Sequence, residues 1–161
     1  MGVIWADSGV TFLNVEGDTI RSPAYIMAVY IINYLEKMSW PSSSLDWPLF
    51  VSHLPESRDD CGAVYDTAGK MDLRSMNGTT YIHPGIQLRI QSKDYETAYE
   101  KIEDIAGALD QVNNVVVQVG DLQYEIQNVS RTSPIVALGV EPGTMRRFSF
   151  TVNFLLSIRE L

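Results

Sequence analysis

Residues 82–112 constrain the fold of this chain most, because they join the pattern of a strand directly to the pattern of an amphipathic helix. Apolar and polar residues alternate over residues 86–91, which is typical of a strand with one buried and one wet face. Over residues 95–112, apolar side chains recur every three or four positions and acidic ones fill the opposite side. Either Ser92 or Asp94 can cap the first turn. The strand and the helix after it are therefore expected to share one core.

Two further hairpins are predicted in the C-terminal half of the chain. Strand patterns over residues 115–119 and 122–129 flank a Gly-Asp pair, which is typical of a tight hairpin turn. Residues 135–140 and 148–158 form a second pair, and the last run alternates over the greatest length. We therefore expect an α+β fold: an antiparallel-rich sheet packed against two main helices, with the last strand central.

The N-terminal part holds a helix that is apolar on nearly every side. Ser22 is a suitable N-cap and Pro23 suits the first helical position, so a helix is predicted over residues 24–38. Such a helix is buried on several sides, either by its own subunit or partly by a neighbouring one, and the sequence leaves both open. Residues 1–20 contain two short strand-like runs. We interpret them as an N-terminal extension of a single domain spanning residues 1–161.

A long inter-strand loop is predicted in the middle of the chain. Residues 47–54 and 63–65 have strand patterns, whereas residues 66–80 show little hydrophobic periodicity. A structureless stretch of that length in a compact domain usually has a functional reason. We expect this loop to bind a neighbouring subunit, with part of it becoming ordered only on assembly.

Charge and hydropathy argue against several classes of partner. A net charge of −8 disfavours binding to a nucleic-acid backbone, which requires a basic surface. Such a charge suits a bore through which DNA slides without sticking, and it also suits a protein that simply needs to stay soluble. The most apolar segment, residues 24–35, is too short to span a bilayer, and no signal peptide is visible. We expect no contact with membranes.

The sequence offers no credible active site. Four acidic residues lie close together, but their spacing matches no metal-binding loop, and acidic loops are usually solvated. These residues are Asp59, Asp60, Asp66 and Asp72. His53 and His83 are interpreted as strand residues, and the single Cys61 excludes an internal disulfide and a cysteine zinc cluster. The acids beside Cys61 would raise its pKa, which disfavours a nucleophile. We predict that the protein is not an enzyme and has no catalytic residue, metal site or cofactor.

The remaining charged residues suggest a contact between subunits. Basic side chains lie on the predicted long loop, on the polar face of the strand over residues 86–91 and at the tip of the last hairpin. The predicted helix over residues 95–112 has an acidic face instead. A contact in which basic loops of one copy meet the acidic helix of the next is heterologous and closes into a ring at the right rotation. Isolated surface charges are the alternative explanation. The candidate interface residues are Asp66, Lys70, Arg74, Arg89, Arg146 and Arg147.

Several of these segments together resemble one protein family. The run over residues 63–69, the strand end at 89–92, the helix opening at 93–99 and the final strand start at 147–154 are similar in order and spacing to a phage protein family. That family is the tail terminator proteins, or minor capsid and head-tail joining proteins, of long-tailed, siphovirus-type bacteriophages. The resemblance runs from near Leu45 to the end of the chain, and its strength lies in the order of the segments.

The resemblance implies a structural virion protein that forms a ring, usually of six subunits, at the head-proximal end of the tail tube. Such a ring stops tube growth and joins the tail to the head connector. The implied partners are further copies of the chain, the tail tube protein and the head connector or completion protein, with DNA passing through the bore unbound. The implied location is the virion, after assembly in the host cytoplasm.

Three alternatives remain from the sequence. Another neck or tail-tube ring protein would belong to the same structural class. A small-ligand-binding domain would need a deep pocket, whereas we expect the aromatic residues of the alternating strands to fill the interior. An acid-dependent hydrolase that uses Asp66 or Asp72 is the least favoured.

Overall fold

A computed structural model describes residues 2–5, 10–13, 22–41, 47–55, 58–71, 76, 82–140 and 146–161. In chain order the elements are β1 (Gly2–Trp5), β2 (Val10–Leu13), α1 (Pro23–Val29), the π-helical turn η1 (Tyr30–Tyr34), β3 (Leu49–Val51), β4 (Cys61–Met71), β5 (Ile82–Ser92), α2 (Tyr95–Leu109), β6 (Asn113–Val119), β7 (Leu122–Arg131), β8 (Val136–Val140) and β9 (Phe148–Glu160). No helix in these ranges has the length and apolar character needed to cross a membrane.

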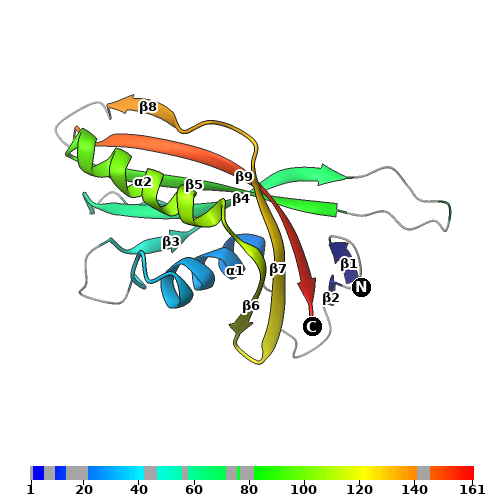
Figure 1. The fold of residues 1–161 in the computed structure, drawn as a ribbon. Coiled ribbons are helices and arrows are strands. Elements are labelled where there is room, and N and C mark those ends of the chain that lie inside the picture. The colour runs from blue at the N-terminus through cyan, green and yellow to red at the C-terminus, as the bar shows by residue number, and fades with distance from the viewer. Residues whose placement is uncertain are drawn as a thin grey trace.

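Seven strands form one curled sheet in the order β3-β4-β5-β9-β7-β6, with β8 also paired to β9 (Figure 1). Every pairing is antiparallel except that of β3 with β4. Strand β9 is central, as predicted: it pairs with β5 along one edge, and β8 and β7 occupy successive parts of its other edge. The separate two-stranded sheet β1-β2 confirms the strand-like runs near the N-terminus. The α+β prediction is therefore confirmed.

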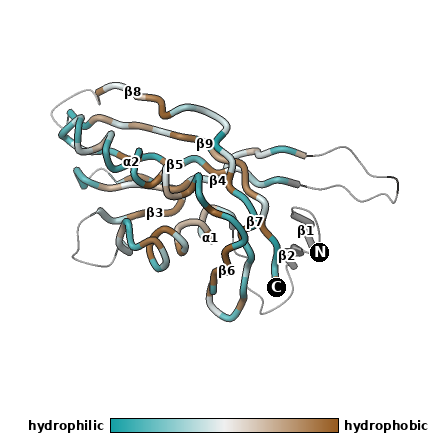
Figure 2. The backbone as a smooth tube through the Cα atoms, in the orientation of Figure 1, coloured by the Kyte–Doolittle hydropathy of each residue, from teal (hydrophilic) through white to brown (hydrophobic). Residues whose placement is uncertain are grey.

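The core lies between one face of this sheet and the two helices. On β5, Ile86, Leu88 and Ile90 are all fully buried, and they lie opposite buried apolar residues of β9. The intervening polar residues of β5 face the other side of the sheet, as the alternation predicted. Figure 2 shows the mixed hydropathy along α2, whose apolar side packs on β5 and β9. Asp94 occupies the N-cap position without a side-chain hydrogen bond to the helix backbone, and it accepts one from the Thr97 hydroxyl instead. Ser92 Oγ accepts a hydrogen bond from Asp94 N at 3.1 Å, one residue before the helix.

The apolar helix α1 is covered by its own chain. Ser22 Oγ accepts a hydrogen bond from Tyr25 N at 3.2 Å, and Pro23 occupies the first turn, as predicted. Every residue from Ala24 to Ile32 except Tyr25 is buried, so the intramolecular explanation holds. The helical segment ends at Tyr34, earlier than predicted, because the backbone widens into a π turn and then reaches a positive φ at Glu36.

The predicted loop over residues 66–80 is wrong in its first part. Strand β4 continues to Met71 and pairs with the start of β5, so Asp66 and Lys70 lie on a strand. We call residues 66–71 and 82–84 the arm, which extends beyond the rest of the sheet (Figure 1). Hydrophobic periodicity is missing there because the side chains of residues 66–71 are exposed, while the backbone ladder alone specifies the strand. Residues 72–75 and 77–81 lie outside the described ranges.

The predicted strand over residues 47–54 is also shorter in the structure. Only Leu49–Val51 pair with β4. Positive φ angles at Trp47 and Ser52 turn the backbone out of the extended conformation on both sides.

A glycine in the arm provides a test of this hairpin. Gly69 has a φ of +66°, and a Cβ there would lie 2.2 Å from the His83 carbonyl oxygen. We expect Gly69→Ala to break the pairing of the arm, so that its amides exchange faster with deuterium while amides of β9 are unchanged. Equal protection of the arm in both proteins would contradict this.

The matched control is Gly107→Ala in α2, where an added Cβ would meet no atom within 4 Å. Because alanine is the better helix former, we expect this control to raise the free energy of unfolding by up to about 1 kcal/mol.

Candidate subunit and partner interface

Strand β8 presents an apolar edge that no described strand covers. It pairs with β9 alone within the described ranges, and all five of its residues are exposed. The exposed fractions of Val136, Leu138 and Val140 are 44%, 50% and 50%. The edge of β6 differs, because Gln118 N donates to the Tyr34 hydroxyl at 2.8 Å. An unpaired, apolar edge strand is a template for association with another chain.

A groove of about 450 Å³ lies beside this edge on the sheet face opposite the helices. We call it the β8 groove. Its floor comes from β4, β5 and β9, and its walls come from β8 and the segment before residue 56. The lining residues are Leu54, Pro55, Tyr65, Arg89, Gln91, Leu138, Gly139, Val140, Arg147 and Ser149.

Arg89 contributes a positive charge to the floor of the β8 groove. Its guanidinium carbon lies 5.6 Å from the centroid of the Tyr65 ring, which fits a cation–π contact. The Nε atom is buried, and no hydrogen-bond acceptor for it is found among the described residues. A buried donor without an acceptor is costly, so the Arg89 guanidinium gains little compensation for its charge within the described part of the subunit.

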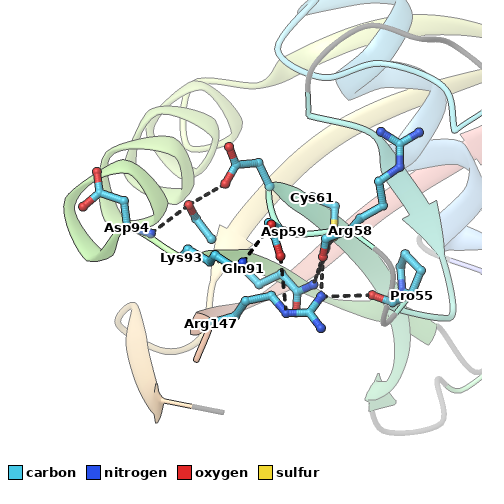
Figure 3. A network of polar contacts seen from close by, with 10 residues as sticks. Pro55, Arg58, Asp59, Cys61, Gln91, Lys93, Asp94 and Arg147 are labelled. Carbon is cyan, nitrogen blue, oxygen red and sulfur yellow. Dashed lines mark hydrogen bonds and ion pairs between the residues drawn. The ribbon is translucent and has the colours of Figure 1, made fainter. Parts of the chain in front are cut away.

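Arg147 is buried beneath the same groove and connects β9 to the loop before β4. Only 1% of the residue is exposed, and its Nη1 donates to the carbonyl oxygens of Arg58 and, at 3.5 Å, of Pro55 (Figure 3). Its Nε lies 4.0 Å from Asp59 Oδ1, and Lys93 Nζ lies 3.4 Å from Asp59 Oδ2. Arg147 therefore stabilises the fold around the groove, whereas its exposed neighbour Arg146 is available to a partner.

The same network holds Cys61 and the acidic residues near it. Gln91 Nε2 donates to Arg58 O at 3.0 Å and lies 3.2 Å from Cys61 Sγ, while Ser92 Oγ donates to Asp60 (Figure 3). Burial raises the pKa of the Cys61 thiol to about 11, and the nearby Asp60 adds only a small part of this shift. The predicted direction of the pKa shift is therefore confirmed, but its main cause is burial of the thiol and not the neighbouring acidic residues. Within the described ranges, no group of three His, Cys, Asp or Glu residues is arranged to hold a metal ion.

The other predicted interface residues lie apart from the groove. Asp66 Oδ1 accepts a hydrogen bond from Ala24 N at 3.0 Å, which joins the base of the arm to the start of α1. Lys70 lies farther along the arm, near His83. Arg74 falls outside the described residues. Of the five predicted interface residues that the structure describes, Arg89 and Arg147 line the β8 groove and Arg146 directly precedes Arg147 in the chain, whereas Asp66 and Lys70 lie on the arm.

Sequence reasoning missed the exposed side chains of β8. The available signal was the lack of alternation over residues 135–140, where apolar residues fall on both faces of the strand. A half-buried strand normally alternates, so apolar residues on both faces of an exposed strand were a signal that this segment differs from the other strands.

Replacing Arg147 should destabilise the fold, because the change removes a donor from the carbonyls of Pro55 and Arg58, leaves Asp59 without this partner and opens a cavity at a buried position. We expect Arg147→Ala to lower the free energy of unfolding by about 2–4 kcal/mol in urea denaturation. The control Arg146→Ala removes an exposed side chain and should change it by less than about 0.5 kcal/mol. Equal effects of the two variants would refute the structural role of Arg147.

The raised pKa of Cys61, about 11, predicts slow reaction with thiol reagents. At pH 8 such a thiol is ionised on the order of 0.1%, against roughly a quarter for an unperturbed cysteine. We expect an aromatic disulfide reagent to modify the native protein at least about 100-fold more slowly than the urea-unfolded chain. The native rate should rise with pH up to about 11. Similar native and unfolded rates would show that the thiol is accessible.

Comparison with known proteins identifies the family. A family model described as bacteriophage tail terminator protein matches residues 31–139, from η1 through most of β8. No curated protein matches the chain in sequence. One similar solved structure is 14% identical, with 81% of this chain and 92% of that chain covered and a TM-score of 0.39. The family match shows that the chain belongs to the bacteriophage tail terminator proteins, which are structural components of the virion tail.

Proposed function

We propose that this tail terminator forms a closed ring of six subunits at the head-proximal end of the tail tube. The ring ends polymerisation of the tube and joins the tail to the head connector. Its partners are further copies of the chain, the tail tube protein and the head connector or completion protein. Assembly takes place in the host cytoplasm.

The single observation that carries this proposal beyond the family is the uncovered apolar edge of β8. An exposed edge strand invites addition of further chains without limit unless a partner covers it. The arm lies away from β8 in the molecule (Figure 1), so two different surfaces are available for contacts with other chains. A contact between different surfaces of identical subunits closes into a ring when the rotation is right, and this closure leaves no uncovered edge.

The charge of the chain fits a ring around DNA. With a net charge of −8, a subunit repels the phosphate backbone over roughly a Debye length, about 8–10 Å at physiological ionic strength. DNA then passes through the bore without specific binding. The interior of the subunit is filled by its own side chains, among them the buried Tyr124, Phe150 and Phe154, which favours a structural role over binding of a small ligand in the core.

Light scattering on the purified protein, alone and mixed with purified tail tubes, tests the ring. We expect a particle of about six times the mass of the single chain, either free or bound at tube ends, and tubes capped by it should stop growing. A monomer under both conditions would exclude the ring. A particle located elsewhere in the tail would instead indicate another neck or tail-tube ring protein.

The role of β8 has a matched pair of variants. Leu138→Lys places a charge on the uncovered edge, whereas Val116→Lys places one on β6, where the residue is similarly exposed at 46% against 50%. We expect the first variant to remain monomeric and the second to assemble normally, with unchanged circular dichroism in both. Normal assembly of the Leu138→Lys protein would show that β8 is not an interface.

A further inference from the structure

We propose that the contact between neighbouring subunits joins the β8 groove of one copy to the acidic face of α2 on the next copy. This inference rests on the proposed ring and names the two surfaces that build it. The argument follows from the charges on each surface, from their positions on the sheet and from the side chains around them.

The β8 groove is basic in a chain that is acidic as a whole. Arg89 lies on its floor, and Arg146 is exposed directly beside the buried Arg147 of its lining. The buried Nε of Arg89 has no acceptor among the described residues. A carboxylate from a partner at the groove surface would pair with the Arg89 guanidinium and balance its positive charge. The groove is therefore suited to bind an acidic surface.

Helix α2 provides a matching acidic surface. Glu96, Glu100 and Glu103 are exposed and make no ion pair within the described ranges, whereas Asp104 lies 3.1 Å from Lys37 Nζ. Glu100 and Glu103 line a shallow hollow of about 560 Å³ that also includes Gly107. The space around Gly107 is open, with no atom within 4 Å of a Cβ built there, so a partner can approach the helix closely.

The two surfaces lie on opposite faces of one sheet. Arg89 points to the face of β5 away from the helices, whereas Leu88 and Ile90 point toward the core beneath α2. A contact between opposite faces cannot be satisfied within a pair of copies related by a two-fold axis. Instead, each copy uses its groove to bind one neighbour and its α2 face to bind the other, which is the head-to-tail arrangement of a closed ring.

Apolar side chains accompany the charges on both surfaces. Leu138 and Val140 form one wall of the β8 groove and are half-exposed. On α2, Tyr95 and Tyr99 are 48% and 40% exposed next to the acidic residues. An interface with aromatic and aliphatic groups among complementary charges fits the composition of stable protein contacts. The acidic surface of a second copy is therefore the occupant that we assign to the groove.

Paired charge reversals test this contact. The groove variant carries Arg89→Glu and Arg146→Glu, and the helix variant carries Glu100→Arg and Glu103→Arg. In either variant alone, like charges meet at every contact, so we expect monomers by light scattering even with tail tubes present. An equimolar mixture places opposite charges at every contact and should form rings in which the two variants alternate.

Control substitutions of similar charge lie outside the proposed contact. Gln123→Glu adds a negative charge at an exposed position of β7 that does not line the groove, and Asp121→Arg changes the exposed turn between β6 and β7. Both should assemble like the wild type. Assembly of the wild type should also weaken as the salt concentration rises, because the contact depends on partly exposed charges.

The outcomes separate this inference from the proposed function. If the wild type forms rings and both charge variants also form them, the surfaces named here are wrong but the ring remains. If the variants stay monomeric and their mixture does not recover, the groove does not bind α2 and serves a different acidic partner. If the wild-type protein forms no ring, either alone or on tail tubes, the proposed function itself is wrong.

Discussion

Strand β9 is the element on which the rest of the structure depends. Its buried apolar residues at every second position from Phe150 to Ile158 give the sheet a face for the core, and the residues between them, polar except for Leu155, form the other face. Because β9 is longer than any neighbour on its second edge, two strands share that edge in succession. One of them, β8, receives a partner on one side only within the described ranges. The uncovered edge is thus a direct result of the length of β9.

Next to that edge, a buried arginine keeps the loop before β4 in place. Arg147 donates hydrogen bonds to the backbone carbonyls of Pro55 and Arg58 in this loop, and its Nε lies near Asp59. These polar contacts hold the wall of the β8 groove that includes Pro55. A buried charge of this kind is tolerated only with its hydrogen bonds satisfied. One wall of the groove is therefore held by contacts within the subunit, while Arg89 on its floor still has an unsatisfied donor.

These features agree with a structural component of a phage tail. The side chains of Asp66 and Ser92 form hydrogen bonds at the starts of α1 and α2. Burial raises the pKa of the Cys61 thiol, which disfavours a role as a nucleophile. Three surface features have no structural role within the described part of the subunit: the apolar edge of β8, the basic β8 groove and the acidic face of α2. The proposed ring would use surfaces of this type rather than an enclosed site.

The sequence by itself determined the elements whose side chains alternate against a core. The patterns of β5, α2 and β9 predicted their positions and their buried faces, because burial on one side imposes a period of two or of about 3.6 residues. The arm was missed because its strands are held by backbone hydrogen bonds, which leave no hydrophobic period at Asp66 or Lys70. Only the tertiary structure decided that Arg147 is buried while Arg146 is exposed, and that Arg89 lines the same groove as residues of β8. Adjacent residues of one charge look alike in a sequence, and their roles depend on contacts with segments far away in the chain.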